Sequence, residues 1–392
     1  MKVDAFSNSA IGKLQRIRGH DAYLRRDYDH FAFIPAPLPT SVLLSERTHQ
    51  LLGAALYAVG RLDSAARRLP QPSLLVRPSL RREAISTSAL EGTYAPLESV
   101  FEADFVAAAN QTAEVREVLN YVRAAEHGLV LIKTKPICVT VIADLQAILV
   151  EGTRGASYDA GRLRTTQVFI GEREEGLENS RFVPPPPGAV LVDGMSDWEK
   201  WINAENDVSL IAKMALGHYQ FEALHPFTDG NGRLGRLVTT LQLVDAGVLK
   251  YPILNLSSWL ERRKEQYKDE LLAVSRTGDF NPWTQFFAEA VRAQAAEAEM
   301  RIEELLTFRT QTIAQLRNAS VRGVAVNIAE DLIGYPVITA GDSARRHGVT
   351  FPPANRAVAK LSELGIVREV TGRSYGRVFV CDDVMSIIRR GL

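Results

Sequence analysis

The residues best suited to carry out chemistry lie together in one segment, HPFTDGNGRLGR at residues 225–236. The first of them, His225, is a base whose pKa ordinarily lies near neutrality, so it can exchange a proton at physiological pH. Asp229 adds one hard carboxylate, which suits an Mg²⁺ ion that is shared with a polyphosphate. The two side chains therefore indicate acid–base chemistry beside a metal ion and a phosphate compound.

A turn of small residues leads into a helix, which the hydrophobic spacing predicts from residue 234 to 243. The turn consists of Gly230, Asn231 and Gly232. Glycine lets the backbone approach a ligand closely, and the free N–H groups at a helix N-terminus favour an anion. Arg233 and Arg236 are three residues apart, so both can face one side of the helix. We expect this part of the segment to bind phosphates.

Other interpretations of the same segment fail. The GNGRLG spacing matches a dinucleotide-binding turn, but that turn must follow a strand, and residues 211–224 have a helical pattern. A calcium-binding loop that starts at Asp229 would need glycine at its sixth position, where Leu234 stands. The lysine motif of the phosphate-binding P-loop does not occur in the sequence.

The segment resembles the signature of the Fic family, HxFx(D/E)GNGRxxR, and matches it at every defined position. Proteins of this family characteristically transfer AMP from ATP to a hydroxyl group of another protein. The related Doc branch, which acts as a kinase, differs in the GNGR part. The intact sequence at residues 230–233 therefore favours nucleotidyl transfer.

The resemblance also implies a role for each residue of the segment. His225 would take the proton from a Ser, Thr or Tyr hydroxyl of the target while that hydroxyl attacks the α-phosphorus of ATP. Asp229 would hold Mg²⁺ that bridges the phosphates. The phosphates themselves would be bound by Gly230, Asn231, Gly232, Arg233 and Arg236, as pyrophosphate leaves.

A second motif, TSALEG at residues 87–92, ends a helix that is predicted to start near Pro78. Glu91 falls in the last turn, where the helix dipole disfavours an anion, so it gains most from a cation outside its own helix. The motif resembles the inhibitory sequence (S/T)xxxE(G/N) of Fic proteins, with Thr87 and Glu91 at the defined positions. The resemblance implies that Glu91 pairs with Arg236 and prevents ATP from binding correctly. In some relatives this glutamate aligns water for the removal of AMP, which leaves de-adenylylation as an alternative activity.

A third segment, at residues 163–171, is rich in β-branched residues and bounded by glycines, which predicts a strand or one arm of a hairpin. It resembles the Fic flap, which would dock a target segment by strand addition. The candidate docking residues are Arg164, Thr165, Thr166 and Gln167. From the residues alone, an ordinary hairpin is an equal interpretation.

The expected fold is mainly α: a helical Fic core with a small β-hairpin flap, followed by a C-terminal winged-helix domain of the α+β type. Residues 1–112 would form an extended N-terminal arm (to about residue 40) and helices that include the inhibitory one. The core would span 113–292, a helical connector 293–318, and the winged-helix domain 319–392. Helices are expected at 98–110, 113–127, 137–150, 195–222, 234–246, 258–275 and 282–318.

The C-terminal domain is predicted from a helix, a turn, an amphipathic helix and two β-like arms around residues 371–376. It carries ten Lys and Arg against seven Asp and Glu over 319–392, which is only mildly basic for a DNA-binding domain. Contact with DNA, formation of a homodimer and docking of the target protein remain open for it. An alternative function is therefore a DNA-binding regulator that uses the Fic core to sense a nucleotide.

The composition restricts the remaining choices. The 392 residues carry 46 Lys and Arg against 46 Asp and Glu, so bulk attraction to nucleic acid or to an anionic membrane is not expected. Two cysteines exclude a disulfide scaffold and suit a reducing compartment. The sequence contains neither an apolar run long enough to cross a bilayer nor a signal-peptide pattern. We expect a cytoplasmic protein with ATP and a protein target as its partners.

Overall fold

Helices make up most of the computed structural model, which describes all residues except 8, 22 and 157. The first half of the chain contains β1 (Gly12–Asp21), β2 (Arg26–Pro35), α1 (Glu46–Ala66), α2 (Val76–Leu90), α3 (Leu97–Glu102), α4 (Ala113–Leu131), α5 (Val139–Val150) and α6 (Gly176–Asn179). The second half contains α7 (Ala189–Asn203), α8 (Leu210–Leu224), α9 (Asn231–Asp245), α10 (Leu256–Glu261), α11 (Lys264–Thr277), α12 (Asn281–Asn318), α13 (Val324–Asp331), β3 (Val337–Thr339), α14 (Ala340–Arg346), α15 (Phe351–Glu363), β4 (Arg368–Glu369), β5 (Val378–Val380) and α16 (Asp382–Arg389). The mainly α class predicted from the sequence is confirmed.

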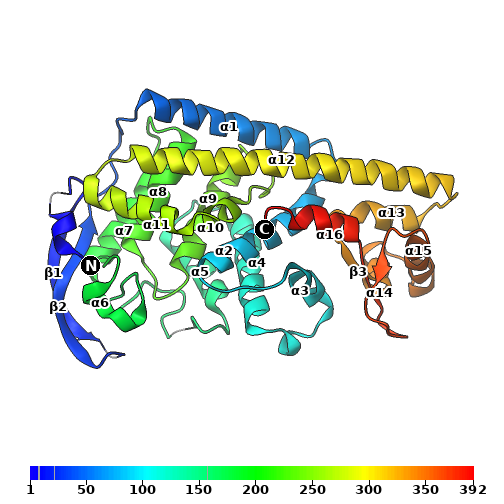
Figure 1. Ribbon diagram of the computed structural model, residues 1–392, viewed down its shortest axis with the longest axis horizontal. Helices are drawn as coiled ribbons and strands as arrows, with labels where there is room; N and C mark the ends of the chain where they lie inside the picture. The colour runs from blue at the N-terminus through cyan, green and yellow to red at the C-terminus, as the bar shows by residue number, and fades with distance from the viewer. Residues whose placement is uncertain (8, 22, 157) are drawn as a thin grey trace.

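The centre of the core is the pair α8 and α9 (Figure 1). Nearly every residue of α8 is buried, on all sides of the helix, so neighbouring helices must surround it. Helices α7, α9 and α12 pack against α8, while α4 and α2 pack against α9. This packing fixes the loop between α8 and α9, which carries the segment 225–230, on a rigid support.

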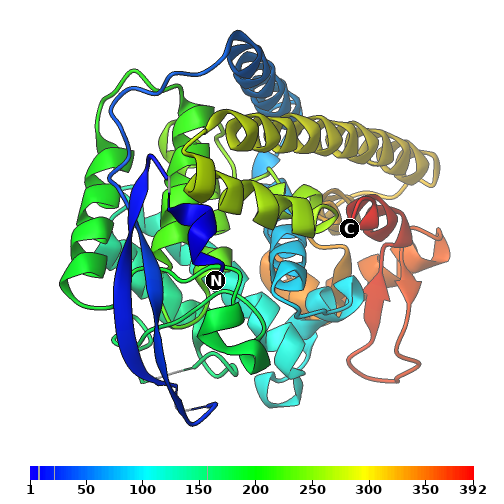
Figure 2. The ribbon, with the colours of Figure 1, turned by 60° about the vertical axis from the view of Figure 1, so that its left-hand side comes forward.

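Two long helices, α1 and α12, run side by side along one edge of the molecule (Figures 1 and 2). Arg61 of α1 and Glu299 of α12 form an ion pair at 2.8 Å, and Arg68 pairs with Glu303 one turn further on. Helix α12 is continuous from Asn281 to Asn318, so it runs from the core through the connector that was predicted at 293–318.

The extended arm that was predicted for residues 1–40 is a β-hairpin in the structure. Strands β1 and β2 are antiparallel, with Gly12 opposite Pro35 and Asp21 opposite Arg26. The hairpin is fastened to the core because the Phe33 N–H group donates to Val183 O at 2.9 Å. The strands were missed because polar residues occur on both faces of β1, where only Ile17 is buried, and because the partner that fastens the hairpin is distant in sequence.

Three predicted helices have different limits. The helix expected at 195–222 is interrupted at residues 204–209, between α7 and α8. The one expected at 258–275 is divided into α10 and α11, and of the one expected at 98–110 only α3 is α-helical. Tertiary packing outweighs local propensity at these positions.

The C-terminal part has the predicted order of elements. Helices α14 and α15 are followed by two short strands, and β3, β5 and β4 form an antiparallel sheet in that order. The winged-helix assignment stays a prediction. The last helix, α16, returns to pack on α12 (Figure 1). Over the part of the chain that the structure describes, no helix is both long and apolar enough to cross a bilayer.

Candidate functional site

His225 lies at the C-terminal end of α8 in an unusual backbone conformation. Its φ and ψ angles are 47° and 62°, in the left-handed region that a residue other than glycine seldom adopts. Its N–H group donates to Phe221 O at 2.9 Å, and its carbonyl accepts from Arg164 Nε at 2.8 Å. These two hydrogen bonds hold the strained turn in place, as is common where a side chain must be aimed precisely.

The electrostatic surroundings keep the His225 imidazole neutral. Burial, followed by the positive charge of Arg164, lowers the pKa of His225 to about 4. A neutral imidazole has one unprotonated ring nitrogen, which can accept a proton at pH 7.

The glycine turn and α9 form the anion-binding end of the site. Gly230 has a φ of 85° and starts α9, and the Asn231 side chain both accepts from and donates to the Phe227 backbone at 2.9 and 2.8 Å. The first N–H groups of α9 have no acceptor within the helix. A Cβ atom on Gly232 would lie 2.2 Å from Glu91 Oε1, so a carboxylate already lies against this helix terminus.

Glu91 binds Arg236, as the resemblance implies, and Thr87 binds the same arginine. Arg236 Nη2 donates to Glu91 Oε1 at 2.6 Å, and Arg236 Nε donates to Thr87 Oγ1 at 2.7 Å. Burial opposes ionisation of Glu91, but the Arg236 charge and hydrogen bond hold the pKa of Glu91 below its usual range. The Nε and Nη2 atoms of the second arginine are therefore occupied by residues at the end of α2.

The first arginine of the motif, Arg233, has a partner that the sequence did not reveal. Its Nη1 donates to Glu117 Oε1 of α4 at 2.6 Å, and its Nη2 lies 3.4 Å from Asp229 Oδ1. Glu117 also accepts from Thr93 Oγ1 at 3.0 Å. Arg233 is thereby held on the Asp229 side of the helix terminus.

Replacing Glu117 with alanine should lower the free energy of unfolding by about 3 kcal/mol, because the Arg233 charge would stay buried without its main partner. Urea unfolding followed by circular dichroism measures this change. Glu126→Ala is the matched control, since Glu126 is exposed on the same helix. Equal losses in the two variants would contradict a structural role for the Arg233–Glu117 pair.

The surroundings of Asp229 fit a magnesium ion that is held mainly by phosphates. Its Oδ1 accepts from the Gly230 N–H group at 2.6 Å, and the side chain is 41% exposed. A Cβ atom on Gly155 would lie 1.8 Å from Asp229 Oδ2, so the glycine gives this carboxylate its room. No cluster of three potential ligands occurs among the residues described, so Asp229 would hold the ion as a single carboxylate. One carboxylate with substrate phosphates is a usual Mg²⁺ arrangement.

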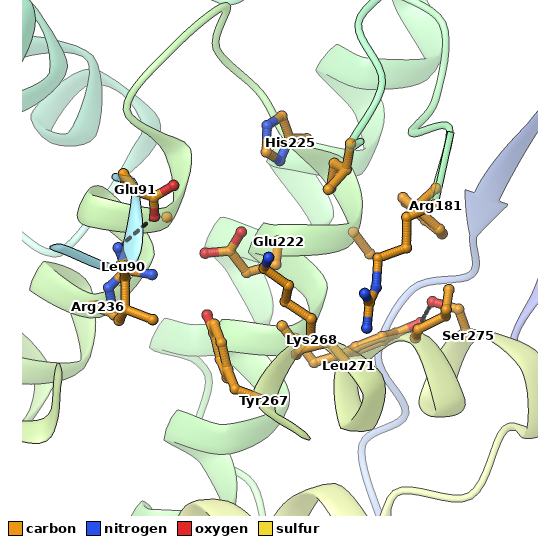
Figure 3. Close-up of a pocket in the computed structure, with 16 residues that line it drawn as sticks. Leu90, Glu91, Arg181, Glu222, His225, Arg236, Tyr267, Lys268, Leu271 and Ser275 are labelled. Carbon is orange, nitrogen blue, oxygen red and sulfur yellow. Dashed lines mark hydrogen bonds and ion pairs between the residues drawn. The ribbon is translucent and has the colours of Figure 1, made fainter. Parts of the chain in front are cut away.

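A pocket extends from Arg236 and Glu91 past His225 toward α11 (Figure 3). Its far end is largely apolar and is lined by Ile170, Phe182, Tyr219, Leu271 and Leu272. Glu222, Tyr267 and Lys268 also line it and were not among the predicted site residues. Glu222 could have been found, because it precedes His225 by three residues on the same helix.

The Glu222 carboxyl should make stability depend on pH. Burial raises the pKa of Glu222 to about 7, whereas the unfolded carboxyl ionises near 4.5. The folded state therefore binds the extra proton, and stability falls as the pH rises from 4.5 through 7, by about 3 kcal/mol at most. Glu222→Gln should remove this loss and melt several degrees higher than the unmodified chain at pH 8, but not at pH 4.5. If the melting temperatures of the unmodified chain and of Glu222→Gln depend on pH in the same way, the Glu222 carboxyl is not the cause.

The flap residues have two different environments. Arg164 is 1% exposed, and its guanidinium donates to the carbonyls of residues 166, 185 and 225. The interpretation of Arg164 as a target-docking residue is therefore wrong: it supports the turn at His225. Thr165 and Thr166 are exposed, and Gln167 donates to Pro184 O at 3.0 Å.

The hairpin that was predicted for the flap is reduced to a single contact. Ile170 and Phe182 form an isolated antiparallel β-bridge, and the described residues between 158 and 188 contain no strand. Prolines in the segment PPPP at 184–187 cannot donate to a ladder, which limits the pairing. The backbone N–H and C=O groups of residues 165–169 therefore take no part in strand pairing.

His225, Gly232 and Arg236 line one pocket of this helical core, and comparisons with known proteins identify the family of the two parts that form it. Residues 49–130 match the model of the Fic/DOC family N-terminal domain, and residues 136–243 match that of the Fic/DOC family. Both parts of the chain are therefore Fic/DOC family domains.

Curated relatives agree with this assignment. The chain is 35% identical over 133 residues to protein adenylyltransferase fic-1 of Caenorhabditis elegans, an alignment that covers 33% of this chain and 23% of the relative. It is 28% identical over 242 residues to protein adenylyltransferase Fic of Drosophila willistoni, which covers 60% of this chain and 44% of that one. The similarity thus spans less than half of either relative.

A solved structure shows the same fold over most of the chain. A Fic family protein from Desulfovibrio desulfuricans superimposes with a TM-score of 0.55 at 21% sequence identity. The match covers 88% of this chain and 98% of the other.

Proposed function

We propose that this protein transfers AMP from ATP to a Ser, Thr or Tyr hydroxyl of a target protein, that is, that it is a protein adenylyltransferase. The proposal rests on one observation: His225, Gly232 at the start of α9 and the buried Arg236 line one pocket. The names of the relatives support the activity, because they are protein adenylyltransferases.

The reaction follows from these positions. The target hydroxyl oxygen attacks the α-phosphorus, and the bond from this phosphorus to the oxygen that bridges to the β-phosphate breaks. Pyrophosphate leaves with that electron pair, and the hydroxyl proton passes to the neutral His225 imidazole. Arg233, Arg236 and the α9 N–H groups stabilise the charge that develops on the phosphates, which is usually the largest catalytic contribution. Bound Mg²⁺, with Asp229 as its protein ligand, would neutralise further phosphate charge.

We further propose that the structure represents a resting state that Glu91 inhibits. Its carboxylate occupies Arg236 and lies against Gly232, where an anionic group of ATP would bind. ATP must displace this carboxylate before its outer phosphate reaches Arg236. The target would approach along the exposed Thr165 and Thr166 of the flap.

The proposal is tested by incubating the Glu91→Gly variant with a cell lysate and ATP labelled on the α-phosphate. We expect labelled protein bands and, by mass spectrometry, an AMP adduct on a hydroxyl side chain. Label that enters protein from the γ-phosphate instead would show phosphoryl transfer and contradict the proposal. Release of AMP from a previously modified target, with no labelling, would favour de-adenylylation.

A further inference from the structure

Glu222 occupies a distinctive place in the pocket. It lies on α8 one turn before His225, and its side chain is 12% exposed. Figure 3 shows its carboxyl between the pair Arg236 and Glu91 on one side and Arg181 on the other. Glu222 therefore stands between the phosphate-binding end of the pocket and its apolar end.

The Glu222 carboxyl has an unused acceptor. Its Oε1 atom is buried and makes no hydrogen bond within the described part of the chain. The closest histidine nitrogen, His218 Nε2, lies 3.9 Å away and is instead hydrogen-bonded to Tyr267 Oη at 2.7 Å. This oxygen lies against Gly235 of α9, where a Cβ atom would be 2.7 Å from it. Because the Glu222 side chain also lines the pocket, a ligand there can supply a donor to its carboxyl.

Most other charged groups of the pocket are donors or are already paired. Arg236 would bind the phosphates in the proposed reaction, while Lys268 donates to Glu265 at 3.0 Å on the surface of α11. The Glu91 carboxylate is bound by Arg236. Glu222 is thus the carboxyl of this pocket that remains to receive a donor from a ligand.

If the phosphates of a nucleoside triphosphate bind Arg236 and α9 and its base packs on the apolar residues, its sugar lies between them. The two hydroxyls of a ribose are hydrogen-bond donors, and a carboxyl accepts from them well. We propose that Glu222 accepts a hydrogen bond from a ribose hydroxyl and makes the site selective for ribonucleotides over deoxyribonucleotides. This inference rests on the proposed nucleotide-binding function.

The test compares ATP with 2′-deoxy-ATP and 3′-deoxy-ATP, each with Mg²⁺, by isothermal titration calorimetry on the Glu91→Gly variant of residues 1–392. At pH 8, where most of the Glu222 carboxyl is ionised, we expect ATP to bind about 10- to 100-fold more tightly than the analogue that lacks the contacted hydroxyl, as for a hydrogen bond to a charged group. In the same background, Glu222→Leu should reduce that preference to about twofold or less. Glu222→Gln, which keeps an acceptor oxygen, should retain part of it. Glu205→Leu, at an exposed glutamate between α7 and α8, is the control and should keep the full preference.

The outcomes separate this inference from the proposed function. If the Glu91→Gly chain transfers AMP but Glu222→Leu and Glu222→Gln discriminate as strongly as their parent, the ribose contact is refuted and the function stands. If Glu222→Gln changes the preference between ATP and inosine triphosphate but not that for ribose, Glu222 contacts the base and the inference is also refuted. If no nucleotide binds, the proposed function itself fails. Since glutamine is nearly isosteric with glutamate, that variant keeps the test decisive even if Glu222→Leu does not fold.

Discussion

Replacing Glu91 with glycine should raise the initial rate of AMP transfer by about 10- to 100-fold. In the resting protein, Arg236 Nη2 donates to Glu91 Oε1 at 2.6 Å, and ATP must break this charge-assisted hydrogen bond before its outer phosphate can use the arginine. Such a bond contributes about 1.5–3 kcal/mol, which corresponds to that range of rates when the free arginine is needed for productive binding. The measurement is the initial rate at which α-labelled AMP is incorporated into protein at a fixed ATP concentration.

Two further substitutions separate charge from size at this position. Glu91→Gln keeps the shape of the side chain and removes its charge, so its rate should lie between those of the unmodified chain and Glu91→Gly. Thr87→Ala removes a second hydrogen-bond acceptor of Arg236. Because the Thr87 hydroxyl is neutral, this substitution should raise the rate of AMP transfer far less than Glu91→Gly. If Glu91→Gly and the unmodified chain incorporate AMP at the same rate, Glu91 is not inhibitory.

The predictable part of the candidate site consists of residues that are neighbours in the sequence. The segment 225–236 is a single turn and helix start, so its residue types and spacing already define the base, the anion-binding turn and the arginines. The pairing of Glu91 with Arg236 was also predicted, although 145 residues separate them. It came from the resemblance and from the unfavourable position of an anion in the last turn of a helix.

The parts that were not predictable depend on how distant helices pack. Glu117 is one of many acidic residues on amphipathic helices, and only the approach of α4 to α9 places it 2.6 Å from Arg233. Arg164 has the appearance of a surface cation in the sequence, yet its five donors suit the crowded carbonyls under the His225 turn. In the fold, the strands β1 and β2 were hidden for the same reason: their stabilising partners, such as Val183, lie far away in the chain.

His225→Ala should lower the rate of AMP transfer by about 10²- to 10⁴-fold, the usual contribution of a general base. The measurement is best made in the Glu91→Gly background, where the rate is high enough for the loss to be followed. Because burial and Arg164 keep the His225 pKa at about 4, the imidazole is the free base at pH 7, and alanine removes this proton acceptor without adding a charge.

Binding and chemistry can be separated in this variant. His225 holds no phosphate in our proposal, so ATP should bind to His225→Ala with an affinity within about threefold of its parent. Arg236→Ala, in contrast, should weaken ATP binding by at least about tenfold, because it removes a charge-assisted contact. A His225→Ala chain that binds ATP normally and still transfers AMP at the parent rate would show that another group takes the hydroxyl proton. The candidate would then be Glu222, which lines the same pocket and whose pKa of about 7 also suits a base, and the double variant with Glu222→Gln would reveal it.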